Sequence, residues 1–128
     1  MKALVCSSLT DDFADIRVED VDLPEPGFGE VRIRIRATSL NFPDILLCQG
    51  KYQLKLEPPF TPGMDISGEI DAVGEGVEDF VVGEAVVGGM RFGGFAEFAE
   101  VSFRCCSSQT ALLYLWLWRR GSPCLTAA

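Results

Sequence analysis

The sequence predicts a small, mostly-β domain that forms a partly open barrel with one or two short helices. Apolar and polar residues alternate in VRIRIRA, residues 31–37, which is the pattern of a half-buried strand. Several other short segments of strand character are separated by turn residues, as in small barrels. The chain has 128 residues, of which 48% are apolar and 23% are charged. That composition predicts one globular domain with a buried core.

The first part of the chain predicts three strands, over residues 2–6, 16–21 and 30–37. Turn-forming prolines and glycines separate the second strand from the third. In the third strand the arginines Arg32, Arg34 and Arg36 alternate with apolar residues. We therefore expect these arginines to form the solvent-facing side of that strand rather than a basic binding patch.

A short helix follows the third strand. Asn41 can cap its N-terminus, Pro43 is tolerated in its first turn, and Gly50 ends it. After a proline-rich loop, three more strands are expected, over residues 66–73, 84–88 and 95–101. The glycine-rich segment GGMRFGG separates the last two strands. It lacks the G-x-G-x-x-G spacing that binds dinucleotides.

The absence of histidine excludes several kinds of site. Without histidine there is no Ser-His-Asp or Cys-His catalytic group and no zinc site that needs imidazole. The cysteines lack C-x-x-C spacing, which predicts neither a disulfide framework nor a zinc knuckle. Cys48, on the short helix, is interpreted as a small buried apolar residue. Free cysteines fit a reducing, intracellular setting, most simply the cytoplasm. The five cysteines are Cys6, Cys48, Cys105, Cys106 and Cys124.

Charge and hydropathy exclude two kinds of partner. The net charge is −8, and an acidic surface repels phosphate backbones, so we expect no nucleic-acid partner. The longest apolar run, residues 111–118, has eight residues, which is far too short to span a membrane. The apolar residues 3–6 are too few for the core of a signal peptide.

Composition changes sharply near residue 104. Residues 1–103 contain all 19 acidic residues, whereas residues 104–128 contain three arginines and both tryptophans. We interpret residues 1–103 as the domain and residues 104–128 as an atypical tail, produced by a frameshift or an alternative C-terminus. A hydrophobic C-terminal helix is the alternative interpretation of the tail.

Three segments together resemble a known family: SLNFPDILLCQGKYQ, PPFTPGMDISGEIDAVGEGVEDFVVGEAVVG and GGFAEFAEV. Their order and spacing are similar to the N-terminal GroES-like domain of the medium-chain dehydrogenase/reductase superfamily. The similarity is greatest to its zinc-independent quinone oxidoreductases, such as zeta-crystallin, and covers roughly residues 1–104. The resemblance implies a GroES-like barrel beside a Rossmann domain that binds NADPH. We expect that second domain to be absent from these 128 residues.

The same resemblance argues against zinc. Zinc-binding members place cysteine at the start of the helical segment and His-Glu after the Pro-Gly pair. Here those positions hold Asn41 and Met64-Asp65. An amide and a thioether cannot replace thiolate and imidazole as zinc ligands. We therefore expect no zinc and a relation to the metal-free, NADPH-dependent branch.

The resemblance also implies a binding site but no catalytic residue in this chain. Asn41 and Tyr52 would lie beside the nicotinamide and the substrate, and Asp44, Met64 and Asp65 would line the same wall. Simpler roles remain open for four of them. Asn41 can be only a helix cap, Asp44 can only stabilise the helix N-terminus, Tyr52 can be a rim aromatic, and Met64 can fill space.

We thus expect the substrate-side domain of an NAD(P)H-dependent oxidoreductase that reduces quinones or activated carbonyl compounds such as enones. Its partner would be that small molecule, and the full-length form could be a homo-oligomer. The 128 residues alone would be inactive. The alternatives are a non-catalytic GroES-like binding module, including a partner for a full-length subunit, and a remnant of a zinc alcohol dehydrogenase.

Overall fold

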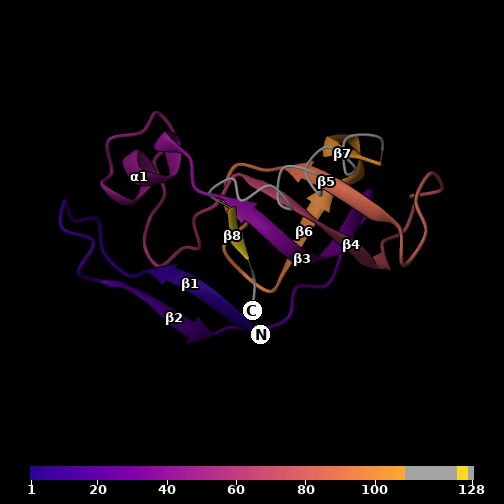
Figure 1. The fold of residues 1–128 in the computed structure, drawn as a ribbon, viewed down its shortest axis with the longest axis horizontal. Helices are drawn as coiled ribbons and strands as arrows, with labels where there is room; N and C mark the ends of the chain where they lie inside the picture. Colours follow the sequence, from indigo (N-terminus) through magenta and orange to yellow (C-terminus); the bar gives the residue numbers. More distant parts are fainter. Residues whose placement is uncertain (109–123, 127–128) are drawn as a thin grey trace.

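The computed structural model describes residues 1–108 and 124–126, and these residues are mostly in strands (Figure 1). They contain one α-helix and one turn of 3-10 helix, which confirms the mostly-β class. The elements are β1 (Lys2–Cys6), β2 (Ile16–Asp20), β3 (Glu30–Ser39), α1 (Phe42–Cys48), β4 (Asp65–Val73), β5 (Ala85–Gly89), β6 (Phe98–Ser102), the 3-10 turn (Phe103–Cys105), β7 (Cys106–Ser107) and β8 (Cys124–Thr126).

The strands form two open sheets. β1 and β2 make a two-stranded sheet, and the larger sheet has the order β6-β3-β4-β5-β7, with β8 also paired to β3 (Figure 1). Every strand pair in the described part of the chain is antiparallel. Two isolated bridges, Ala3 with Ala96 and Cys6 with Phe60, connect β1 to two segments that are distant from it in the sequence.

The main core lies on one face of the larger sheet. Alternate residues of β3 face it, and Val31, Ile33 and Ile35 are at most 3% exposed. Burial of each such side chain contributes about 1.5–3 kcal/mol before entropy is considered. The predicted alternation of this strand is therefore confirmed. The other buried members of the cluster come from the neighbouring strands: Ile66, Ile70, Val86, Ala99 and Val101.

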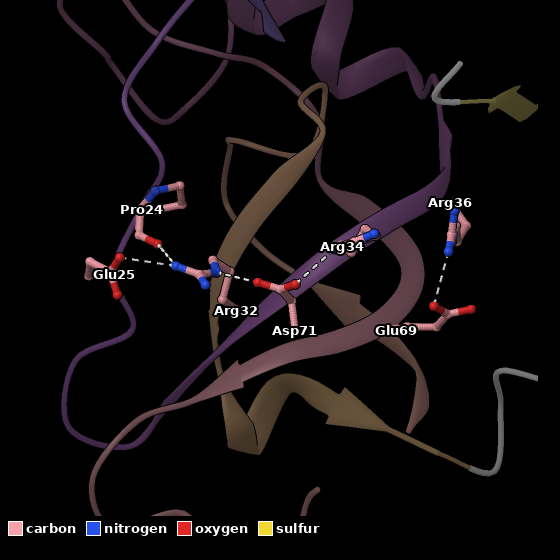
Figure 2. A network of polar contacts seen from close by, with 7 residues as sticks. All are labelled: Pro24, Glu25, Arg32, Arg34, Arg36, Glu69 and Asp71. Atoms are coloured by element: carbon pink, nitrogen blue, oxygen red, sulfur yellow. Dashed lines mark hydrogen bonds and ion pairs between the residues drawn. The ribbon is translucent and has the colours of Figure 1, made fainter. Parts of the chain in front are cut away.

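The arginines of β3 lie on the opposite face, but they are not simply solvated. Arg32 Nε lies 2.7 Å from Asp71 Oδ2, and Arg34 Nη2 lies 3.2 Å from Asp71 Oδ1. Figure 2 shows Asp71 between the two guanidinium groups. The Arg32 side chain is only 13% exposed, so the expectation of a fully wet face was wrong for this residue. Ion pairing and a contact with the preceding loop cover it.

Two further contacts complete this network. Arg32 Nη1 donates to the Pro24 carbonyl at 3.0 Å and lies 3.2 Å from Glu25 Oε1, which fastens the loop before β3 to the sheet (Figure 2). Arg36 pairs with Glu69 at 3.1 Å, where both side chains are about half exposed.

A second apolar cluster positions the helix. Leu47 and Cys48 of α1 pack against Cys6 of β1 and Phe60 of the following loop, and all four are buried. Burial raises the pKa of the Cys48 thiol to about 12. The interpretation of Cys48 as a small buried residue is therefore confirmed. This packing holds the helix against β1 and leaves its first turn beside the larger sheet.

Two short strands lie beyond the boundary that the composition suggested. β7 pairs with β5, and β8 pairs with β3. The boundary at residue 103 itself stays a prediction. The C-terminal helix considered for the tail would contain the apolar run 111–118, which falls outside the described residues. Among those described, no helix is both long and apolar enough to cross a membrane.

Candidate functional site

A chain of polar side chains forms where β3, α1 and β4 meet. The pairing of Ser39 with Asp65 places the end of β3 beside the start of β4. The Asn41 amide follows β3 and donates to Asp65 Oδ2 at 2.7 Å and to Ser39 Oγ at 3.1 Å. The structure therefore brings together two of the residues expected to share a wall, Asn41 and Asp65. Ser39 is a neighbour that the sequence did not single out.

Asn41 is also the N-terminal cap of α1, as the sequence predicts. Its backbone N–H donates to Asp44 Oδ2 at 2.8 Å, and the Asp44 N–H donates back to the Asn41 carbonyl at 3.0 Å. A carboxylate in the first turn satisfies helix N–H groups and interacts favourably with the helix dipole. Asn41 thus both caps the N-terminus of α1 and contacts Asp65.

Asp44 is an unusually buried carboxylate, with 1% of its surface exposed. Burial raises the pKa of its carboxyl above the ordinary value. The N–H groups of Asn41 and Gly63 oppose that rise, and the nearby Asp65 carboxylate adds to it. Among residues 1–108, no donor forms a hydrogen bond with the buried Oδ1 atom of Asp44. A buried, incompletely satisfied carboxylate destabilises its own ionised form.

This environment predicts a pH dependence of stability. Because the pKa of Asp44 is higher in the folded state than in the unfolded state, the protonated carboxyl contributes to stability. This contribution is fully present below about pH 3.9, the pKa of Asp in the unfolded chain. That contribution is lost as pH rises through the folded pKa. Asp44→Asn cannot ionise, so the variant is expected to gain stability relative to the wild type between about pH 4 and pH 7. Urea unfolding of both proteins at about pH 4 and pH 7 measures the difference in their free energies of unfolding. If that difference were the same at both pH values, the raised pKa of Asp44 would be contradicted.

The other two predicted residues, Tyr52 and Met64, line a cavity of about 310 Å³. Both are partly buried and pack against the second apolar cluster. The predicted site is thus divided into a polar chain, with Asn41, Asp44 and Asp65, and an adjoining apolar cavity. The peptide bond between Met64 and Asp65 joins the two parts.

The glycine-rich loop after β5 supplies residues that sequence reasoning missed. Met90 and Arg91 line the same cavity as Tyr52 and Met64. The loop is held in place because the Met90 N–H donates to the Met64 carbonyl at 2.8 Å and the Gly93 N–H donates to that of Thr61 at 2.7 Å. The test for dinucleotide-binding spacing does not detect this loop, because the loop contributes two single side chains, Met90 and Arg91, rather than a spaced glycine motif.

Comparison with known proteins identifies the family. Residues 27–110 match the family described as the alcohol dehydrogenase GroES-like domain. The chain belongs to this family. Quinone oxidoreductase-like protein 2 homolog from Nematostella vectensis is 40% identical to this GroES-like domain chain over 113 residues, which are 87% of the chain and 28% of that protein. Quinone oxidoreductase-like protein 2 from Mus musculus is 33% identical over 111 residues, covering 87% of the chain and 29% of that protein.

Solved structures of larger proteins also match most of this chain. The human synaptic vesicle membrane protein VAT-1 homolog-like protein has a TM-score of 0.80 and 28% identity, over 84% of this chain and 35% of that one. The quinone oxidoreductase from Thermus thermophilus, also solved in complex with NADPH, has a TM-score of 0.69 and 29% identity, over 96% of this chain and 42% of that one. The chain therefore spans well under half the length of each of these relatives.

The GroES-like domain described here suits only part of a nicotinamide cofactor. A phosphate is commonly bound at a helix N-terminus, but in α1 the Asp44 carboxylate already occupies that position and would repel a second anion. The polar chain can instead meet an uncharged amide or hydroxyl group. At the start of α1, therefore, these residues suit an uncharged group, such as a carboxamide, better than a phosphate.

The expected absence of zinc stays a prediction. Within residues 1–108, no group of three or more histidine, cysteine, aspartate or glutamate side chains is placed to hold a metal ion. At the positions where zinc-binding members are expected to have ligands, this domain has Asn41, Met64 and Asp65, of which only Asp65 is a common zinc ligand. Metal analysis of the purified protein tests the prediction directly.

Proposed function

We propose that this domain forms the substrate-side wall of an NAD(P)H-dependent oxidoreductase that reduces quinones or enones. The observation that carries the proposal is the polar chain of Asn41 and Asp65 beside the cavity lined by Tyr52 and Met64. The names of the quinone oxidoreductase-like relatives and of the NADPH complex support the reaction class. An apolar cavity with a few fixed polar groups is also the usual form of a small-molecule site.

The polar chain determines what Asn41 can offer a ligand. Its two Nδ2 hydrogens are directed at Asp65 and Ser39, so toward a ligand the side chain acts as an acceptor through Oδ1. It would orient a carboxamide N–H or a hydroxyl group. Tyr52 also lines the cavity, and its hydroxyl group is of a type that can donate to a carbonyl oxygen.

The protein's own contribution is therefore positioning and the exclusion of water. Met64 and Tyr52 give a flat substrate ring an apolar surface, and Asp44 holds the first turn of α1 through Asn41. The nicotinamide, when bound, supplies the hydride. Holding two reactants in register accounts for a large part of the rate in such reactions.

A chimeric enzyme tests this function. Residues 1–103 would replace the corresponding segment of the Nematostella relative, and NADPH consumption would be followed with 1,4-naphthoquinone and with an enone. We expect turnover, and we expect Asn41→Ala to lower kcat/KM on the order of tenfold. Glu69→Gln is the control and should leave kcat/KM unchanged, because Glu69 pairs with the half-exposed Arg36 and does not line the cavity. A folded chimera that consumes NADPH with none of these substrates would contradict the proposal.

We propose further that the 128 residues alone bind a substrate without turning it over. The position of Asp44 at the start of α1 supports this, because it denies the cofactor phosphates a site there. Titration of the chain with NADPH is expected to show no saturable binding. If the purified 128-residue chain oxidised NADPH by itself, this second proposal would be excluded.

A further inference from the structure

Arg91 differs from most of the other cations of the acidic domain. Among the eight basic residues of 1–103, five make ion pairs and Lys55 donates to the Gly50 carbonyl. Arg91 and Arg17 make no side-chain hydrogen bond or ion pair within residues 1–108. Of these two, Arg91 lines the cavity of the proposed site. The five paired residues are Lys2, Arg32, Arg34, Arg36 and Lys51.

The backbone that carries Arg91 is fixed on both sides. Before it, the Met90 N–H bonds the Met64 carbonyl, and after it, Gly93 and Gly94 bond the carbonyls of Thr61 and Gly63 at 2.7 and 3.0 Å. The side chain itself is exposed. A rigid loop thus presents an unpaired guanidinium at the edge of the cavity.

The rest of the cavity determines which ligand fits. Met64, Met90 and Leu54 provide apolar surface, the Tyr52 ring provides an aromatic one, and Gln53 adds an uncharged amide. Among the described residues, Arg91 is thus the one charged residue of the lining. A volume of about 310 Å³ is at the lower end of the range for small-molecule sites. Thioethers and an aromatic ring pack well against a flat ring. A guanidinium at the rim favours an anionic oxygen at the edge of that ring.

We propose that Arg91 is a specificity-determining residue that selects flat aromatic ligands carrying an anionic oxygen at their edge, such as carboxylated or sulfonated rings. The inference rests on the proposed function in treating this cavity as the substrate site, but binding does not require turnover. Because the surrounding domain is strongly acidic, it repels anions, and Arg91 offsets that repulsion locally.

A matched pair of ligands tests the inference on the 128-residue chain. Naphthalene-2-carboxylate and naphthalene-2-carboxamide have nearly the same shape, differ in charge and do not react with thiols. Each is titrated into ¹⁵N-labelled protein, and the shifts of amide signals give Kd. We expect the carboxylate to bind about fivefold more tightly at low salt. This preference should shrink as salt is added, since the Arg91 side chain is exposed.

Variants assign the preference to one residue. Arg91→Gln should abolish it while leaving the carboxamide affinity unchanged, and Arg91→Lys should keep part of it. Arg17→Gln, which removes the other unpaired cation, should keep all of it. Dispersed amide spectra would show that each variant is folded.

Three outcomes would overturn the inference: no binding of either ligand, equal binding of both by the wild type, or an unchanged preference in Arg91→Gln. The result is independent of NADPH. A chimera without reductase activity would therefore refute the proposed function and leave a measured Arg91 preference standing. A chimera that reduces quinones, together with no preference for the carboxylate, would support the proposed function and refute the inference about Arg91.

Discussion

Replacing Gly68 by alanine is expected to destabilise the domain by about 3 kcal/mol or more, which is near the upper end for overpacking. A Cβ atom at this position would lie 2.1 Å from the Arg34 carbonyl oxygen and 2.9 Å from Ile33 Cγ2. The nearer contact is with backbone of the adjacent strand, so a change of rotamer cannot relieve it. Urea unfolding would show a lower midpoint with a similar m-value.

The geometry of the sheet explains why this position is crowded. Gly68 of β4 pairs with Ile35, and the register of β3 against β4 shifts between Ile35 and Ala37. An extra residue in one strand bends it and increases the local twist. β3 therefore approaches β4 closely at Gly68, and the space that a side chain would need is filled by backbone.

A second glycine provides the control. Gly89 ends β5, and a Cβ atom added there has no neighbour within 4 Å and needs no positive φ. Gly89→Ala should be neutral or stabilising by up to about 1 kcal/mol, because alanine restricts the unfolded chain. If Gly68→Ala and Gly89→Ala unfolded at the same urea concentration, the close approach of β3 and β4 would be refuted.

The sequence predicted the strands better than the contacts between them. A period of two shows which residues of β3 face the core, because alternate side chains point to opposite faces. It does not show the cross-strand partner. Asp71 lies 39 residues from Arg32, and their contact depends on a register that two irregularities shift. The burial of Arg32 was therefore out of reach of pattern reasoning.

The site shows the same limit. The resemblance named Asn41 and Asp65 without the hydrogen bond between them, which joins residues 24 positions apart. It grouped Tyr52 with them, although Tyr52 lines the adjoining cavity. A single arginine in a glycine-rich loop has neither periodicity nor spacing, so only the fold could bring Arg91 to that cavity.

Asp71→Asn is expected to lower stability by about 2 kcal/mol at pH 7, in the range for a partly buried charge that loses its partner. Asp71 is the common acceptor of Arg32 and Arg34, and its side chain is 19% exposed. An amide cannot accept from both guanidinium groups with both of its polar atoms. Arg32 would retain only Pro24 and Glu25, of which the Glu25 side chain is 82% exposed.

The effect should depend on pH in a defined direction. Burial alone would raise the pKa of Asp71, but hydrogen bonds from Arg32 and Arg34 outweigh it and hold the pKa below its ordinary value. The stabilisation is thus present above about pH 3.9, the unfolded value, and is lost as pH falls through the folded pKa. The wild type should exceed Asp71→Asn by its full margin at pH 7 and by progressively less below about pH 4.

Glu69→Gln separates this effect from the simple loss of a surface charge. Glu69 pairs with Arg36 on the same face of the sheet, but both side chains are about half exposed. Such pairs contribute roughly 0.2–1 kcal/mol, so this variant should unfold close to the wild type at both pH values. Equal losses in the two variants would mean that the network acts only through surface charge. A larger loss in Asp71→Asn that shrinks in acid would show that Asp71 is the carboxylate that secures the buried Arg32 and, through Arg32, the loop at Pro24.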